Sequence, residues 1–223
     1  MVEKIAHDAP VLVLGLGRFG AATAGELDKL GRDVLAVDAD PALVQKWSDR
    51  VRHTAVLDAR DMNALQQIGA ADFSVAVVAV GSSIEASVLI TTHLVDLKIP
   101  QIWAKAISEA HGKILTRIGA HRVIYPEREA GERVAHLVSG RMIDFIRFDD
   151  DFALVKMYPP KPIRGKTLTE SGVRTKYNFT VVGVKSPGKP FTYATEKTVV
   201  TNHDLIIVSG SNEDIERFAA LDS

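Results

Sequence analysis

The stretch VLVLGLGRFG at positions 11–20 constrains the fold of this chain more than any other. An apolar, strand-like run stops at Gly15, three glycines follow in a G-x-G-x-x-G spacing, and a helix-like segment begins. Gly15 permits a tight turn, Gly17 lets the backbone approach a pyrophosphate, and Gly20 allows the new helix to pack closely on its strand. The N–H groups at the start of that helix then face the phosphates. The pattern predicts a nucleotide-binding strand–turn–helix unit.

A lone G-x-G-x-x-G is a weak signal, so its surroundings have to support it. A second strand-like run, Val34–Val37, follows the predicted helix and ends at Asp38. Asp38 lies about 18 residues after Gly20, which is typical of a carboxylate that holds the ribose hydroxyls of a nucleotide. We therefore assign Asp38 to the ribose, and a role as partner of a helix cap is the alternative.

Strand-like and helix-like segments continue to alternate as far as position 138, with short loops between them. Helix starts are marked by Asp40-Pro41, by Ser108 and by a capping box over 82–85. This alternation predicts an α/β fold with a doubly wound parallel Rossmann sheet. The predicted strands are 11–14, 34–38, 54–57, 73–80, 102–104 and 122–126.

The alternation ends at an acidic break over 148–151, and the rest of the chain indicates a smaller α+β domain. There we expect strands at 152–157, 179–184 and 205–208, a short helix at 168–177, and a terminal helix capped by Ser211. The predicted organisation is a Rossmann nucleotide-binding domain at 1–140, a linker at 141–150, and the small domain at 151–223.

Composition narrows the classes of partner. A net charge of −1 argues against nucleic acid or an anionic membrane as the main partner, because both need concentrated positive charge. The absence of cysteine excludes disulfides, thiolate metal sites and thiol catalysis. No stretch reaches the ~20 apolar residues of a membrane helix, and positions 1–8 lack a signal-peptide core. We expect a soluble, cytoplasmic protein without direct lipid insertion.

Ligands of parallel sheets bind beyond the carboxyl ends of the strands, so the residues that end each strand converge on one crevice. Lys105 directly ends a buried strand, where an ammonium is costly unless an anion meets it; phosphate contact is the favoured role and a surface ion pair the alternative. Asp58 either lies at the adenine edge or caps the next helix, and Glu127 suits a helix start with or without a ligand. The candidate nucleotide-binding residues are Gly15, Leu16, Gly17, Arg18, Phe19, Gly20, Asp38, Asp58, Ala59, Gly81, Lys105 and Glu127.

Catalytic machinery is not evident in the sequence. The histidines lack metal-ligand spacing, and we find no Ser/His/Asp arrangement, nucleophile elbow or Walker lysine motif. A dehydrogenase also needs a substrate domain with a general acid or base, and the segment 151–223 offers only His203, in a turn-like setting. We predict a non-enzymatic nucleotide-binding protein, and an NAD(H)-binding redox enzyme or sensor is the alternative.

Five stretches of the chain resemble the KtrA-type regulatory subunits of Ktr/Trk potassium uptake systems, which have RCK N-terminal and RCK C-terminal domains. These stretches are VLGLGRFG (13–20), VLAVD (34–38), IPQIWAKA (99–106), IGAHRVIYPE (118–127) and VRTKY (173–177). The resemblance implies an octameric ring beneath a membrane K⁺-translocating subunit, with ATP, ADP or NAD(H) in the Rossmann crevice. A regulator of a different transporter or channel is a second alternative.

The resemblance also implies roles for single residues. Positions 15–20 match the phosphate loop of the family, Asp38 its ribose acid, and Lys105 its phosphate lysine. Glu127 matches an acid near the terminal phosphate, where a cation such as Mg²⁺ or Ca²⁺ binds. Arg18 and Glu127 are then the candidates to distinguish ATP from ADP, because only residues that touch the terminal phosphate can do so.

Some relatives bind cyclic di-AMP at a dimer interface of the C-terminal domain. The corresponding residues here are Leu168, Thr169 and Arg174. Arg174 matches the phosphate-binding arginine of those relatives, whereas Thr169 stands where a large aliphatic residue is more usual.

The predicted helix over 83–97 carries more apolar residues than one amphipathic face requires, which predicts a homo-oligomer. These residues are Ile84, Val88, Leu89, Leu94, Val95 and Leu97.

Overall fold

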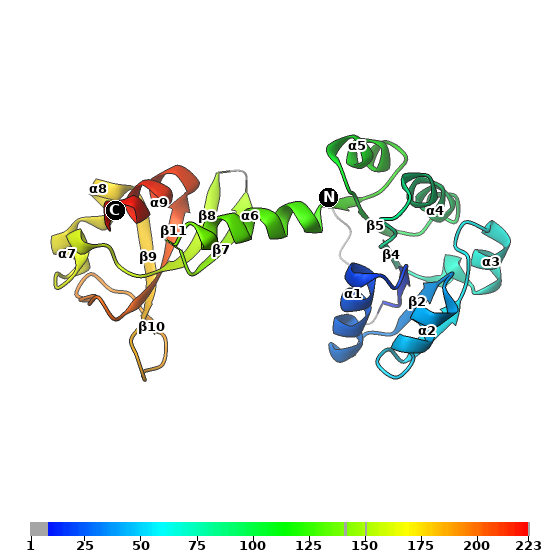
Figure 1. The fold of residues 1–223 in the computed structure, drawn as a ribbon, viewed down its shortest axis with the longest axis horizontal. Coiled ribbons are helices and arrows are strands. Elements are labelled where there is room, and N and C mark those ends of the chain that lie inside the picture. Colours follow the sequence, from blue (N-terminus) through cyan, green and yellow to red (C-terminus); the bar gives the residue numbers. More distant parts are fainter. Residues whose placement is uncertain (1–8, 141, 150, 223) are drawn as a thin grey trace. The chain divides into compact units, whose positions relative to one another are not determined.

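The computed structural model describes residues 9–140, 142–149 and 151–222. Positions 1–8, where we expect no signal-peptide core, lie outside the described residues. The chain divides into two compact units, 1–127 and 128–223. Each unit has its own sheet (Figure 1). Each also has its own hydrophobic core. Within the described residues, no helix combines the length and the apolarity needed to span a bilayer.

The N-terminal unit is built on a six-stranded parallel sheet in the order β3-β2-β1-β4-β5-β6. This is the order of a doubly wound Rossmann sheet, so the predicted fold is confirmed. The sheet reverses its direction of growth between β1 and β4, where ligands of such sheets bind. The strands are β1 (Val11–Leu14), β2 (Val34–Asp38), β3 (His53–Val56), β4 (Val75–Val78), β5 (Gln101–Lys105) and β6 (Arg122–Ile124).

Helices connect these strands, and α2 and α5 begin where the sequence predicts a cap. Asp40 caps α2 by accepting a hydrogen bond from the N–H of Ala42. The capping box predicted over 82–85 is wrong, because α4 is capped by Ser83, whose hydroxyl accepts from the N–H of Ala86. The helices are α1 (Arg18–Lys29), α2 (Pro41–Trp47), α3 (Met62–Gln67), the 3₁₀ helix η1 (Ala70–Asp72), α4 (Ile84–Asp96), α5 (Glu109–Arg117) and α6 (Pro126–Val138).

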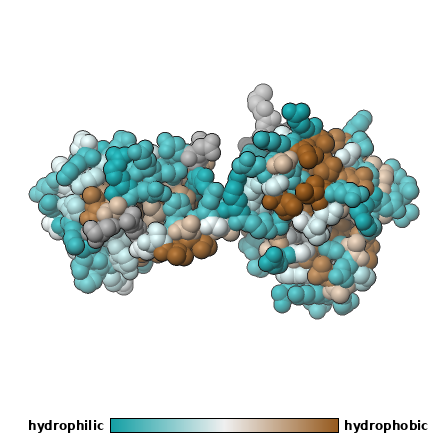
Figure 2. Space-filling view, turned by 45° about the horizontal axis from the view of Figure 1, so that its top comes forward, coloured by the Kyte–Doolittle hydropathy of each residue, from teal (hydrophilic) through white to brown (hydrophobic). Residues whose placement is uncertain are grey.

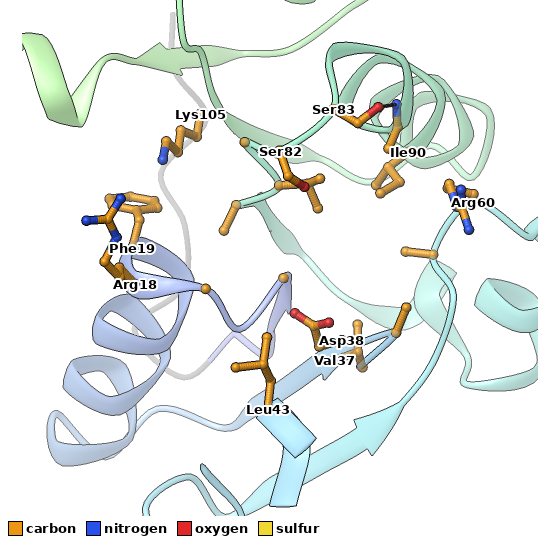
Figure 3. A pocket seen from close by; sticks show the side chains of 18 of the residues that line it. Arg18, Phe19, Val37, Asp38, Leu43, Arg60, Ser82, Ser83, Ile90 and Lys105 are labelled. Atoms are coloured by element: carbon orange, nitrogen blue, oxygen red, sulfur yellow. Dashed lines mark hydrogen bonds between the residues drawn. The ribbon is translucent and has the colours of Figure 1, made fainter. Parts of the chain in front are cut away.

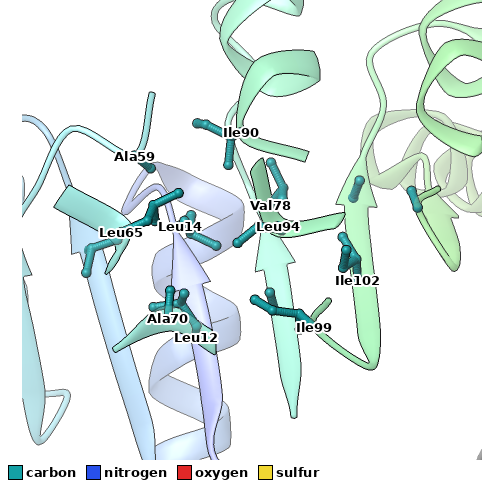
Figure 4. Close-up of a cluster of buried hydrophobic side chains, with 14 of the residues drawn as sticks. Leu12, Leu14, Ala59, Leu65, Ala70, Val78, Ile90, Leu94, Ile99 and Ile102 are labelled. Atoms are coloured by element: carbon teal, nitrogen blue, oxygen red, sulfur yellow. The ribbon is translucent and has the colours of Figure 1, made fainter. Parts of the chain in front are cut away.

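Both faces of this sheet are buried. Side chains alternate along a strand, so Leu12 and Leu14 of β1 join the apolar layer formed with α3, α4 and α5 (Figure 4). Val11 and Val13 join the opposite layer, formed with α1 and α2. None of these four side chains is more than 3% exposed. This double burial explains why the strands are almost continuously apolar in sequence.

The C-terminal unit contains an antiparallel sheet in the order β10-β9-β11-β8-β7. Its core includes Phe179 of β9 and Phe218 of α9, whose rings lie 4.4 Å apart. The small α+β domain is therefore confirmed. Its strands are β7 (Asp144–Asp149), β8 (Phe152–Met157), β9 (Phe179–Lys185), β10 (Thr192–Tyr193) and β11 (Leu205–Ser211), and its helices are η2 (Lys161–Ile163), α7 (Leu168–Ser171), α8 (Val173–Tyr177), α9 (Asn212–Ala219) and η3 (Ala220–Asp222).

Two predictions for this unit are wrong. The segment 141–150, expected as a linker, contributes strand β7, and Phe145 of that strand is buried in the core. The acidic run that suggested a break lies at the β7–β8 connection, where Asp149 pairs with Phe152. The helix expected over 168–177 is divided into α7 and α8 at Gly172, whose φ of +61° ends the first helix.

The boundary between the compact units lies at 127/128, inside α6, and not at position 140. From Arg128 onward, α6 belongs to the C-terminal unit and packs within it. Arg133 forms an ion pair with Asp144 at 2.7 Å, and the His136 ring stacks on Phe145 at 4.0 Å.

Candidate functional site

A cavity of about 720 Å³ opens at the carboxyl ends of the parallel strands (Figure 3). It is lined by the loops that follow β1 to β5 and by the start of α6. Ten of the candidate nucleotide-binding residues line it, whereas Leu16 and Gly20 do not. The sequence did not mark Val37, Ala39, Leu43, Leu57, Arg60, Ala79, Val80, Ser82, Ser83, Ala86, Ile90 and Ile107, although all lie within a few residues of marked positions or on the facing helices.

The three glycines of the first loop occupy different environments. Gly15 has a φ of +102°, which favours glycine. A Cβ on Gly20 would lie 1.9 Å from the carbonyl oxygen of Gly15 and 2.7 Å from Cβ of Ala79, so Gly20 serves close packing. A Cβ on Gly17 would meet nothing within 4 Å. Gly17 also brings no side-chain cap to α1, which leaves the first N–H groups of that helix available to an anion.

Asp38 connects the end of β2 to the glycine loop. Its Oδ2 accepts a hydrogen bond from the N–H of Leu16 at 2.6 Å, and its Oδ1 accepts from the N–H of Asp40 at 2.9 Å. Asp38 therefore does partner the cap residue of α2, as the alternative role requires. A carboxylate accepts about four hydrogen bonds, so acceptor capacity remains for two ribose hydroxyls.

Lys105 and Glu127 come together as an ion pair. The Lys105 Nζ donates to Glu127 Oε1 at 2.6 Å. The Lys105 side chain is only 12% exposed, whereas that of Glu127 is 63% exposed. The hydrogen bond from Lys105 lowers the pKa of Glu127, and the charge of Arg18 lowers it further. Glu127 is therefore ionised near neutral pH, beside the two cations that line this end of the cavity.

Asp58 does not cap the following helix. Asp61 caps α3 by accepting from the N–H of Asn63. Asp58 instead holds Arg60: its Oδ1 accepts from Nε at 2.9 Å and its Oδ2 from Nη2 at 2.7 Å. The hydrogen bond from the Arg60 side chain lowers the pKa of Asp58. The only sequence signal for this pair is the arginine two positions after the acid.

The C-terminal unit has a second cavity, of about 800 Å³, lined by Leu168, Thr169 and Arg174 among others. The three candidate cyclic di-AMP residues therefore lie at one site. The hydroxyl of Thr169 donates to the carbonyl oxygen of Glu196 at 3.1 Å, across the cavity wall. Thr195, Glu196 and Lys197 also line this cavity.

Comparison with known proteins identifies two domains in this chain. Residues 11–126 match the TrkA-N domain, and residues 152–222 match the TrkA-C domain. The chain is 33% identical over 207 residues to "Ktr system potassium uptake protein A" of Bacillus subtilis, covering 92% of this chain and 93% of the relative. It is also 33% identical to "Ktr system potassium uptake protein C" of the same organism, covering 92% and 94%.

Solved structures agree with the fold. The "GsuK channel bound to NAD" superposes with a TM-score of 0.66 at 17% identity, over 97% of this chain and 40% of that chain. The "GsuK bound to ADP" superposes with a TM-score of 0.53 at 23% identity, over 60% and 35%. The chain thus spans less than half the length of these GsuK proteins.

Proposed function

We propose that this chain, which belongs to the family of Ktr-type potassium uptake proteins with TrkA-N and TrkA-C domains, is a cytoplasmic regulatory subunit. In this role it binds ATP or ADP and gates a membrane K⁺-translocating subunit in response. The observation that carries the proposal is the N-terminal cavity, where a carboxylate, a glycine loop and a nearly buried lysine line one space at the switch point of the sheet.

The lining of the cavity suits the parts of an adenine nucleotide in order. Figure 3 places Arg18 and Lys105 at one end and Asp38 nearer the other. Phosphates fit the cationic end, beside the N–H groups at the start of α1. The ribose fits the carboxylate of Asp38. Buried Val37 and Ile90 line the remaining space, which suits a purine.

Glu127 is the residue proposed to hold a divalent cation. Among the described residues, no group of three or more histidine, cysteine, aspartate or glutamate side chains forms a metal site. A cation here would therefore be bound by one carboxylate together with phosphate oxygens, the arrangement common for Mg²⁺ at nucleotides.

Gating requires that ATP and ADP interact differently with two states of the assembly. We propose that Arg18 contacts the terminal phosphate of ATP and that Glu127 holds the cation beside it. ADP lacks this phosphate. A coupling free energy of about 1–3 kcal/mol per site is usual, and several sites acting together would shift the equilibrium strongly.

The subunit is proposed to act as a homo-oligomer, by family resemblance an octameric ring. Figure 2 shows hydrophobic surface gathered on the N-terminal unit. Of the apolar residues expected to be exposed on α4, Leu94 is fully buried, whereas Ile84 and Leu89 are about 40% exposed. Ile107, just before α5, and Ile114, on α5, are exposed as well and add to the apolar surface. Such a surface favours contact with further copies.

Titration and flux measurements test the proposal. ATP, ADP and NADH are titrated into the purified chain, with and without Mg²⁺ or Ca²⁺. The chain is then reconstituted with a Ktr membrane subunit in vesicles, where ATP should support more K⁺ flux than ADP. Absence of binding by any adenine nucleotide would refute the proposal, and equal flux with both nucleotides would refute the gating.

NAD(H) is the second candidate ligand, because a structural neighbour is described as bound to NAD. Asp58 and Glu127 are poorly suited to serve as the general acid of a redox enzyme, since such an acid works best with a pKa near 7, whereas their cationic partners lower the pKa values of both carboxylates. NADH binding tighter than ATP binding would favour an NAD(H) sensor.

Cyclic di-AMP is a candidate ligand of the C-terminal cavity, with Arg174 as its phosphate contact. Because Thr169 replaces a large aliphatic residue there, we expect weak binding. Titration of wild type and Arg174→Ala tests this, and submicromolar affinity of the wild type would contradict it.

A further inference from the structure

The N-terminal cavity has a third guanidinium or ammonium group that phosphate binding does not explain. Arg60 lines the cavity but lies across it from Arg18 and Lys105, on the side of Val37 and Ile90 (Figure 3). Arg60 therefore faces the end of the cavity where the proposed function places the base, and any contact it makes there is to the base or the ribose.

Asp58 fixes the plane of this guanidinium before any ligand arrives. The Nε and Nη2 groups donate to its two carboxylate oxygens, and the Arg60 backbone N–H donates to Oδ1 as well. Hydrogen bonds of a guanidinium lie in its plane, so a chelated guanidinium keeps its flat faces free for stacking. Ordering in advance also removes part of the entropy that a long side chain loses on binding.

We propose that Arg60 stacks its guanidinium face on the purine base of the bound nucleotide, and that Asp58 positions it. This inference rests on the proposed function. It adds a cationic cover for the base to the buried apolar residues Val37, Leu57 and Ile90, which line the same cavity. Cations over π systems are attracted by the ring face, and arginine is common in this role.

A phosphate-binding role for Arg60 fits less well. An arginine beside the ribose acid accommodates the 2′-phosphate of NADP in some Rossmann proteins. Here, however, the in-plane donors Nε and Nη2 are engaged by Asp58, and Glu85 contributes further negative charge near the guanidinium. Asp38 adds a third carboxylate to this end of the cavity. NADPH should accordingly bind more weakly than NADH.

The test compares ligands with and without a purine. Arg60→Ala should weaken ATP and ADP alike, by about 3- to 30-fold. Inorganic tripolyphosphate, which has no base, should compete with nucleotide binding as strongly in Arg60→Ala as in the wild type. The preference of the protein for ATP over UTP should become smaller in Arg60→Ala. Arg60→Lys keeps the charge without the planar face and should restore only part of the affinity that Arg60→Ala loses. Asp58→Asn should have a smaller effect than Arg60→Ala, and none in the Arg60→Ala background.

Arg50→Ala is the matched control, because Arg50 is another exposed arginine of the same unit, lies over Trp47 and does not line the cavity. It should leave every affinity unchanged. Full rescue by Arg60→Lys, equal loss of tripolyphosphate and ATP, unchanged ATP affinity in Arg60→Ala, or NADPH binding tighter than NADH would each overturn the stacking role. Failure of the wild type to bind any adenine nucleotide would instead refute the proposed function itself.

Discussion

A single methyl group on Gly20 should destabilise the N-terminal unit, whereas the same group on Gly17 should not. The Cβ of Gly20→Ala would lie 1.9 Å from the carbonyl oxygen of Gly15 and 2.7 Å from Cβ of Ala79. Because the first contact is with backbone, α1 must move away from β1 or β4 to relieve it. Gly17 has a φ of −64°, which alanine adopts freely, and open space around it.

Overpacking costs about 1–3 kcal/mol, and a contact this short with backbone belongs at the upper end of that range. The better helix propensity of alanine returns about 0.5–1 kcal/mol. The net destabilisation of Gly20→Ala should be about 2 kcal/mol, which lowers the Tm of a unit of this size by roughly 6–10 °C. For Gly17→Ala, we expect the stability of the unit to be unchanged or slightly increased.

Urea unfolding followed by circular dichroism measures both variants, and nucleotide titration of the folded protein separates stability from binding. Gly17→Ala should keep its stability but lose nucleotide affinity, because its Cβ stands where the phosphates are proposed to approach. Wild-type stability of Gly20→Ala would show that the helix can shift at little cost and would refute the packing argument. Equal destabilisation of both variants would refute the distinction between the two glycines.

The remaining predictions concern the charged residues of the cavity. Asp38→Ala should weaken adenine nucleotide binding by about 1.5–3 kcal/mol, and unchanged calorimetric titrations would sink the ribose assignment. Arg18→Ala should reduce ATP affinity more than ADP affinity, whereas Lys105→Ala should weaken both; equal losses in Arg18→Ala would make it a general phosphate anchor. Glu127→Gln should preserve or improve cation-free nucleotide affinity and abolish the tightening by Mg²⁺ or Ca²⁺. Lys105 lowers the pKa of Glu127, so the Glu127 carboxylate becomes protonated only at a pH below the ordinary pKa of a glutamate. The difference in cation-dependent nucleotide affinity between wild type and Glu127→Gln should therefore stay constant from about pH 8 to pH 5.

The parts of the fold that were predictable are those encoded by local sequence. The apolar strands of the Rossmann sheet and the caps at Asp40 and Ser108 need only a few neighbouring residues to be recognised. The sequence does not predict strand β7 because Phe145 is the only core side chain among those described for it, whereas Ile146 and Phe148 are exposed. Its pairing with β8 decides its structure, and a pattern within the segment does not reveal such pairing.

The same distinction holds in the cavity. The topology of a parallel sheet places strand ends together, so Asp38 and Lys105 could be assigned from their positions alone. The direction of a side chain could not be assigned in this way. Asp58 has two equally good roles in sequence. The structure rules out the helix cap, whereas the place at the adenine edge stays a prediction. The carboxylate turns to Arg60, an arrangement set by rotamers rather than by strand order.

Under the proposed function, the two ends of the cavity have separate tasks. Contacts to the base and ribose are common to ATP and ADP, so they raise affinity without distinguishing the effect of ATP from that of ADP. At the other end, an incoming phosphate has to share the Lys105 ammonium that Glu127 holds at 2.6 Å. When the phosphate takes over the Lys105 ammonium, the Glu127 carboxylate loses its partner and lies beside additional negative charge. Its affinity for a cation should therefore rise. Nucleotide and cation should therefore bind cooperatively through one lysine, and because coupling is reciprocal, each should raise the affinity of the other by the same factor.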